Sequence, residues 1–130
     1  MIKMISTGDK NCPYFNEYAK RLVWKHKIMT YSKPPQYLDL IDAKKEKIIL
    51  LDERGEQMTS VEFAKFMEKT TGDICFIVGG ASGFPAVVYD VPHQKMALSK
   101  MTLPHEWARI ILIEQIYRAQ QILAGHPYHK

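Results

Sequence analysis

The chain has 130 residues, 46% of them hydrophobic, so it has the size of one domain, over residues 1–130, and can bury a real core. Eighteen basic and fourteen acidic residues give a formal net charge of +4. No apolar run approaches the roughly 20 residues of a membrane span, and the N-terminus has no apolar stretch typical of a signal peptide, so we expect a cytoplasmic protein.

The first elements predicted along the chain are a strand, a helix and a second strand. Residues 2–6 predict a short strand, and Asn11 followed by Pro13 favours a helix start. Apolar residues at helical spacing extend this predicted helix to about Lys27. Residues 26–32 predict the second strand, which two prolines then end.

The central part of the chain predicts two strands that are covered on both faces. Residues 47–52 (KIILLD) and 74–78 form nearly continuous apolar runs, as buried parallel strands do. Between them, Thr59 and Glu62 have the spacing of a capping box and predict a helix to about Thr70.

The last elements are a short helical turn at residues 85–89, a strand at 95–99 and a long helix. Thr102 and Pro104 introduce this helix, which ends at Gly125. Its apolar residues cover more than one face, so we expect one side to pack on the sheet and the other on a second copy of the chain. Strands that alternate with helices predict an α/β fold with a mainly parallel sheet flanked by helices.

Ligands of open α/β sheets bind at the carboxyl ends of the strands, and three loops leave strand ends here. They are residues 52–55, 79–83 and 99–102. The glycine-rich loop 79–83 lets the backbone approach a ligand closely. It lacks the Lys-Ser/Thr of a phosphate-binding P-loop and does not match G-x-G-x-x-G. A ligand contact and a tight strand-to-helix turn therefore both remain possible for it.

Charged and polar residues offer further candidates. From Lys10 to Lys33 there are six basic residues against one acid, Glu17, which suits either a phosphate-rich partner or a solvated face. The polar tail of residues 125–130 reads either as a disordered end or as an RNA contact surface whose aromatic ring stacks on bases.

Several single residues have narrower expectations. His105, at the start of the long helix, is expected to be a neutral imidazole. Arg109 and Arg118 interrupt that apolar helix, so each is expected to have a carboxylate or phosphate partner. Cys75 lies in an apolar run and is expected to be a buried, inert thiol. His126 and His129 have no supporting cluster, so no metal site is expected.

Three segments together carry a resemblance to a known family. LLDERG (residues 50–55), FIVGGASG (76–83) and ALSKMTLPHEWARIILIEQIYRAQQILAGHPYHK (97–130) resemble the RlmH-type large-subunit rRNA pseudouridine N3-methyltransferases of the SPOUT superfamily. The resemblance covers the C-terminal two thirds closely and the first strand and helix loosely. Relatives usually carry a longer segment, with an additional helical stretch, where residues 34–46 stand here.

The resemblance implies a homodimer whose C-terminal part forms a trefoil knot that binds S-adenosylmethionine. It further implies methyl transfer to N3 of a pseudouridine in 23S rRNA of the assembled ribosome. The residues themselves, as described above, give no reason to expect a membrane or a metal partner. By position, the family's cofactor contacts correspond to Leu51, Gly79, Leu98, Ser99, Lys100, Met101, Thr102 and Leu103.

The N3 proton of the acceptor must leave, so a nearby base or hydrogen-bonding group would help. Our candidates are His129 and Tyr128, with Arg118 to steady a phosphate or base. Two other functions remain open on the sequence. One is a non-catalytic RNA- or ribosome-binding α/β module, and the other is a nucleotide-binding regulator that uses the glycine loop.

Overall fold

The computed structural model describes residues 1–130 and contains a five-stranded sheet in which all neighbouring strands are parallel. The strand order is β2-β1-β4-β3-β5. The predicted α/β fold with a parallel sheet is confirmed. The strands are β1 (Ile2–Thr7), β2 (His26–Tyr31), β3 (Glu46–Gln57), β4 (Asp73–Val78) and β5 (Gln94–Ala97).

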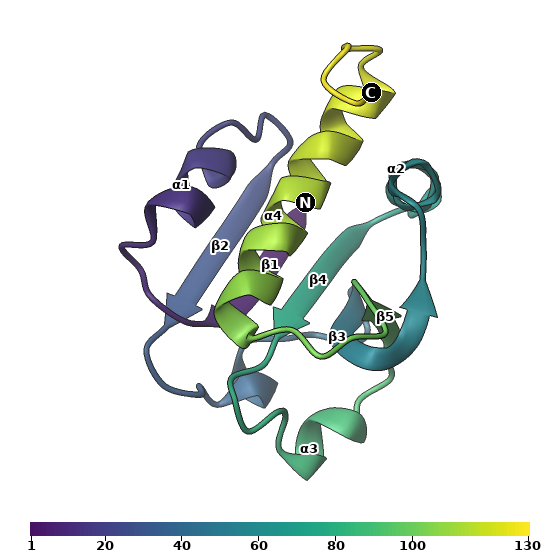
Figure 1. Ribbon diagram of the computed structural model, residues 1–130. Helices are drawn as coiled ribbons and strands as arrows, with labels where there is room; N and C mark the ends of the chain where they lie inside the picture. Colours follow the sequence, from purple (N-terminus) through teal and green to yellow (C-terminus); the bar gives the residue numbers. More distant parts are fainter.

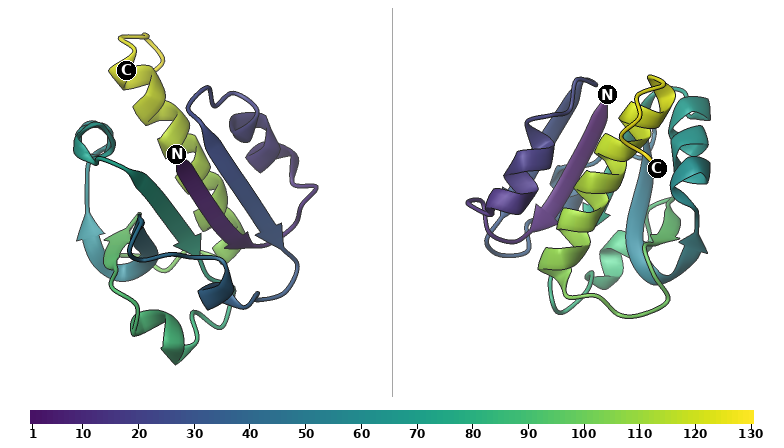
Figure 2. Two further views of the ribbon diagram at one scale, coloured as in Figure 1. Left: turned by 180° about the vertical axis from the view of Figure 1, so that it is seen from behind. Right: turned by 45° about the horizontal axis from the view of Figure 1, so that its top comes forward.

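Helices cover the two faces of the sheet unequally. The long helix α4 (His105–Leu123) crosses one face, with α1 (Pro13–Ala19) on one side of it and α2 (Ser60–Lys69) on the other (Figure 1). The opposite face, seen from behind in Figure 2, carries only the 3₁₀ turn η1 (Tyr37–Asp39) and the short helix α3 (Ala86–Tyr89), both toward the carboxyl ends of the strands. The carboxyl edge of β3, β4 and β5 therefore lies between α3 and the start of α4.

Two apolar clusters hold these layers together. The larger one joins the α-helical face of the sheet to α1, α2 and α4, and includes Phe15, Phe63 and Phe76. The smaller one joins the opposite face to Tyr37 of η1 and Val88 of α3. Because central strands are buried on both faces, they are apolar throughout, as the sequence indicated. No helix of the chain has the length and hydropathy needed to cross a membrane.

Helix α1 is shorter than the sequence predicted. It ends at Ala19 rather than near Lys27, and the predicted helical residue Val23 is 82% exposed. The backbone N–H of Val23 donates instead to the side-chain oxygen of Gln120 at 2.7 Å, from a helix almost a hundred residues away. This long-range hydrogen bond replaces a helical one, and it sets the direction of the chain as it enters β2.

Strand β3 is longer than predicted because the expected turn at residues 53–56 is a bulge. The pairing with β5 shifts register between Leu51 and Glu56, so the strand continues to Gln57. A bulge leaves residues unpaired and redirects their side chains. It points the residues that follow Leu51 toward the carboxyl edge of the sheet.

The predicted capping box of α2 is confirmed, since Thr59 and Glu62 exchange hydrogen bonds. Helix α4 buries Leu112, Ile113 and Ile116 against the sheet. Its outer side keeps Trp107 55% exposed, and a second copy on that side stays a prediction.

Candidate functional site

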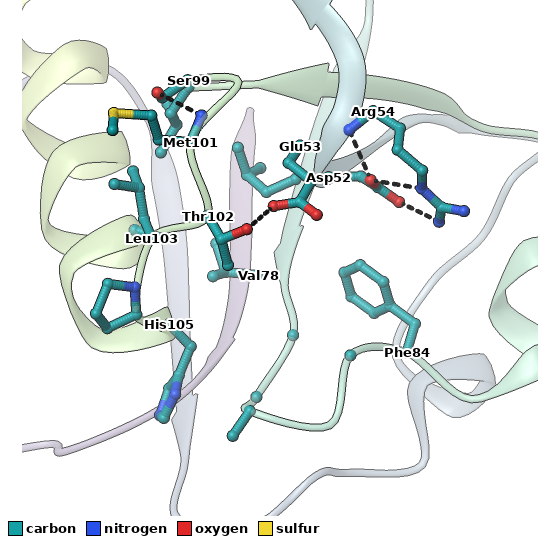
Figure 3. A pocket seen from close by; sticks show the side chains of 18 of the residues that line it. Asp52, Glu53, Arg54, Val78, Phe84, Ser99, Met101, Thr102, Leu103 and His105 are labelled. Carbon is teal, nitrogen blue, oxygen red and sulfur yellow. Dashed lines mark hydrogen bonds and ion pairs between the residues drawn. The ribbon is translucent and has the colours of Figure 1, made fainter.

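A cavity of about 750 Å³ opens at the carboxyl ends of β3, β4 and β5. It is formed by the three loops that the sequence predicted, as the close view in Figure 3 shows. The lining residues are Leu51, Asp52, Glu53, Arg54, Val78, Gly79, Gly80, Ala81, Gly83, Phe84, Tyr89, Leu98, Ser99, Met101, Thr102, Leu103, Pro104, His105 and Ala108.

Seven of the eight predicted cofactor-contact residues line this cavity. They are Leu51, Gly79, Leu98, Ser99, Met101, Thr102 and Leu103. Lys100, the eighth, is exposed and is not a lining residue. The sequence reasoning missed the aromatic residues Phe84 and Tyr89, whose rings pack edge to face at 5.9 Å. Their only signal was their position just beyond the glycine loop.

The glycine loop forms a tight turn that is also a wall of the cavity. The N–H of Gly83 donates to the carbonyl of Gly80 at 3.0 Å, and Gly83 has a φ of 75°, which favours glycine. A Cβ at Gly79 would lie 3.2 Å from the carbonyl oxygen of Gly83. The sequence left two roles open for this loop, a tight turn and a ligand contact. Because the turn is itself a wall of the cavity, the loop can have both roles.

A side-chain hydrogen bond joins the loop after β5 to strand β3. The hydroxyl of Thr102 donates to the Glu53 carboxylate, and the backbone N–H of Met101 donates to the Ser99 hydroxyl at 2.9 Å. The first bond holds the loop against the bulge of β3, and the second lies within the loop and stabilises its turn. The wall so formed exposes backbone groups and the side chains of Leu51, Leu98 and Leu103 to the same space.

Asp52 and Arg54 form a bidentate ion pair on the same strand. The guanidinium donates to both carboxylate oxygens, at 3.0 and 2.7 Å, and the Arg54 backbone N–H adds a bond at 2.9 Å. Asp52 is only 8% exposed, whereas Arg54 is 67% exposed. These hydrogen bonds from Arg54 hold the pKa of Asp52 at about 2, so that the carboxylate stays ionised. The pair fixes Arg54 at the edge of the cavity.

The predicted catalytic residues lie together, but at the other end of α4. Glu114 accepts hydrogen bonds from Arg118 at 2.9 Å and from the Tyr128 hydroxyl at 3.0 Å. Arg118 also lies 3.0 Å from Nδ1 of His129 and stacks over the Tyr128 ring. The C-terminal tail thus folds back on its own helix, and its end is not free in this arrangement.

Protonation in this cluster follows from its contacts. Burial and the hydrogen bond to Glu114 raise the pKa of Tyr128, so its phenol stays protonated and acts as a donor. A guanidinium can only donate, so Nδ1 of His129 is the acceptor in its contact with Arg118.

Arg118 and the cavity are separated along one helix. Ala108 lines the cavity and Arg118 follows ten residues later, which is about 15 Å along an α-helix at 1.5 Å per residue. One chain therefore does not bring its cavity and its tail cluster together.

The other predicted arginine of α4 is fully buried and has a carboxylate partner as expected. Arg109 pairs with Glu106 at 2.5 Å and donates to Ser6, Thr30 and the carbonyl of Asp9 at 3.0–3.2 Å. These bonds fasten α4 to the ends of β1 and β2. Arg109 does not line the cavity, so it holds the layers of the fold together.

The thiols and histidines show no metal cluster. Both cysteines are free and buried, and burial raises the pKa of Cys75 to about 12, which confirms a buried, protonated thiol. No group of three or more His, Cys, Asp or Glu side chains is arranged to hold a metal ion.

The chain is similar to known methyltransferases. A family model described as a predicted SPOUT methyltransferase matches residues 2–129. A protein of Anaeromyxobacter sp. named ribosomal RNA large subunit methyltransferase H is 37% identical over 91% of this chain and 89% of its own length. Proteins of the same name from Bacteroides fragilis and Nitratidesulfovibrio vulgaris are 51% and 48% identical over 63% of this chain.

The match to the Bacteroides fragilis and Nitratidesulfovibrio vulgaris proteins spans 55% of their length. Among solved structures, a probable methylase family protein from Haemophilus influenzae has the same fold, with a TM-score of 0.61 at 10% identity. That match covers 99% of this chain and 70% of the other.

Proposed function

The chain belongs to the SPOUT methyltransferase family, and on this premise we propose that it transfers a methyl group from S-adenosylmethionine to N3 of a pseudouridine in 23S rRNA of the assembled, cytoplasmic ribosome. The observation that carries the proposal is the cavity at the carboxyl edge of the sheet. The resemblance predicts eight cofactor contacts, and seven of these residues line that one cavity.

The residues of the cavity fit this cofactor. Adenine is flat and largely apolar, and Leu51, Leu98 and Leu103 offer it an apolar wall. The loops 79–83 and 99–102 expose backbone groups that can hydrogen-bond to its polar edge. The cofactor has no phosphate, so the cavity needs no cluster of free cations, and its one guanidinium, Arg54, is already paired with Asp52. When bound, S-adenosylmethionine supplies a methyl group on a sulfonium centre.

The catalytic residues are proposed to come from a second copy of the chain in a homodimer. The tail cluster lies about 15 Å along α4 from the cavity, and the outer side of α4 exposes Trp107 and leaves Ile111 half-buried. A two-fold pairing of these outer sides with α4 antiparallel would set the tail of each chain near the cavity of its partner. The trefoil knot implied by the resemblance belongs to the same proposal.

In this assembly the tail positions the acceptor and takes up its proton. Arg118 turns from His129 to a phosphate or base of the RNA, which leaves Nδ1 of His129 free to accept the N3 proton. Tyr128, whose raised pKa keeps it protonated, donates a hydrogen bond to the acceptor. The main contribution of the protein is alignment of donor and acceptor.

Removal of Tyr128 to Lys130 should abolish methylation of ribosomes and leave the Kd for S-adenosylmethionine nearly unchanged. Unchanged turnover would show that the tail takes no part in the chemistry. Subunit mixing then tests the second copy. The truncated chain keeps an intact cavity, and a Leu51→Arg chain keeps an intact tail, so a dimer of the two has one complete site. Mixing two inactive homodimers should restore about a quarter of the wild-type activity, whereas no recovery from exchanged subunits would place tail and cavity within one chain.

The basic surface from α1 to the end of β2 is proposed to bind the rRNA backbone. Residues 9–33 contain six of the eighteen basic and two of the fourteen acidic residues, so they carry the whole net charge of +4. The rest of the chain has twelve of each. Four lysines of this segment are exposed and form no ion pair: Lys10, Lys25, Lys27 and Lys33.

This same surface favours the second candidate function, a non-catalytic RNA- or ribosome-binding module. Calorimetric titration separates the candidates. Binding of S-adenosylmethionine supports the methyltransferase, and ribosome binding without cofactor binding supports the module. Preferential binding of ATP or NAD instead would support a nucleotide-binding regulator.

A further inference from the structure

Glu53 is an acidic side chain inside the candidate cofactor cavity with no basic partner. It lies on the bulge of β3, and one of its carboxylate oxygens accepts the hydrogen bond from Thr102. None of the ion pairs of the chain includes it. In Figure 3 the other oxygen points into the open space of the cavity.

The charges of the other two ionised side chains that line the cavity cancel. Asp52 and Arg54 form their bidentate pair, and no other Asp, Glu, Lys or Arg lines the cavity. The uncompensated charge of the cavity is therefore the single negative charge of Glu53. A ligand that carries a positive charge next to this carboxylate gains an attraction that a neutral ligand of the same shape does not.

We propose that Glu53 makes the cavity select the cationic methyl donor over the neutral thioether product. The inference rests on the proposed use of S-adenosylmethionine. Donor and product, S-adenosylhomocysteine, share the adenosine, the amino group and the carboxylate. They differ in the methyl group and in the positive charge at sulfur, which disappears when the methyl group leaves. The charge of Glu53 thus favours binding of the donor and release of the product.

The order of groups along the cavity sets the sulfur next to Glu53. Figure 3 shows Leu103 and Met101 on one side, Glu53 with Thr102 in the middle, and Arg54 on the other side. The donor has a matching order: an adenosine, a sulfonium in the middle and an amino acid whose carboxylate can accept from Nη1 of Arg54, the guanidinium nitrogen that the pair with Asp52 leaves unused. An adenosine on the leucine wall and a carboxylate toward Arg54 place the sulfonium beside Glu53.

The size of the effect follows from Coulomb's law. Two unit charges at about 4 Å attract by an amount that corresponds to roughly fivefold in affinity in a water-like medium, and by more where the dielectric is lower. Glu53 is exposed, so solvent and salt screen it. We expect about a 3- to 10-fold preference for the donor from this one charge.

The test compares Glu53→Gln with the wild-type protein by calorimetric titration of three ligands. Glutamine keeps an oxygen that accepts from Thr102 and loses only the charge. We expect the Kd for S-adenosylmethionine to rise about 3- to 10-fold, and the Kd for sinefungin, which has an amine near the sulfonium position, to rise in the same direction. The Kd for S-adenosylhomocysteine should stay nearly constant, and added salt should shrink the donor effect.

Two control variants separate charge from structure. Thr102→Val removes the hydrogen bond and keeps the carboxylate, so it should change the Kd of donor and product by the same factor. Glu56→Gln removes an exposed charge from the same strand outside the cavity and should change neither. The inference is overturned if Glu53→Gln raises the Kd for donor and product by the same factor, or if it changes neither Kd. Failure of the wild-type protein to bind S-adenosylmethionine contradicts the proposed function instead.

Discussion

Substitution of Gly55 by alanine tests whether the close packing of β3 on β5 positions the loops that form the cavity. Gly55 lies in the bulge of β3, beside the backbone of β5. A Cβ at this position would lie 2.6 Å from the carbonyl carbon of Lys95 and from the amide nitrogen of Met96. These atoms belong to backbone and cannot rotate away. Carbon atoms pack best at about 3.5 Å or more, so β3 and β5 must separate by roughly 0.9 Å.

The cost of this separation can be estimated from overpacked cores. Overpacking destabilises a protein by typically 1–3 kcal/mol, which for a chain of 130 residues corresponds to a fall in Tm of roughly 3 to 15 °C. Strand β5 leads directly into Leu98 and Ser99, so its displacement should also weaken S-adenosylmethionine binding at least several-fold. Thermal unfolding by circular dichroism and calorimetric titration measure the two effects.

Gly80→Ala is the matched control for this substitution. Gly80 lines the cavity, but its Cβ would lie 3.5 Å from the nearest atom, a methyl carbon of Thr7, which is an ordinary contact. Its Tm should change by no more than about 2 °C. A Gly55→Ala protein with the Tm and cofactor affinity of the wild type would refute the reasoning about the bulge.

Three further predictions concern stability and accessibility. Arg109→Met should lower the free energy of unfolding by about 3–5 kcal/mol in urea, because Glu106 and the polar groups around it lose a buried partner; a loss under 1 kcal/mol would contradict this role. Cys75, whose pKa is raised to about 12, should react with a thiol reagent at pH 8 only when the chain unfolds, and rapid labelling of a Cys12→Ser protein would disprove its burial. Because the pKa of Asp52 is lowered to about 2, its stabilising contribution is complete above the ordinary value of about 3.9 and is lost as the pH falls toward 2, so the stability gap between wild type and Asp52→Asn should narrow over that range; a constant gap would contradict the assigned shift.

The sequence was sufficient to predict the sheet and the place of the cavity. Apolar runs at residues 47–52 and 74–78 mark strands that are buried on both faces, and parallel strands bring their carboxyl ends to one edge. The glycine loop and the residues after β5 therefore had to lie near one another. Local patterns carry this information, because each strand and each turn is encoded by consecutive residues.

Features that depend on distant contacts could not be read from the sequence. The end of α1 is set by Gln120, whose side chain accepts a hydrogen bond from the Val23 N–H. No sequence pattern near Val23 predicts that distant partner. The tail is held by Glu114, on the helix that precedes it, so a segment that resembles a frayed end is packed. The sequence could not show that the charge of Glu53 is uncompensated, because this depends on the ion pair that Arg54 forms with Asp52.

The central claim is methylation of a pseudouridine in 23S rRNA, and mass spectrometry of that rRNA tests it most directly. Ribosomes from cells that lack the gene are compared with ribosomes from the parent and from cells that express the full chain or the chain without Tyr128 to Lys130. The account predicts that one pseudouridine-containing fragment of 23S rRNA loses the mass of a single methyl group when the gene is absent, and that only the full chain restores it. An identical modification pattern in the presence and absence of the gene would contradict the account.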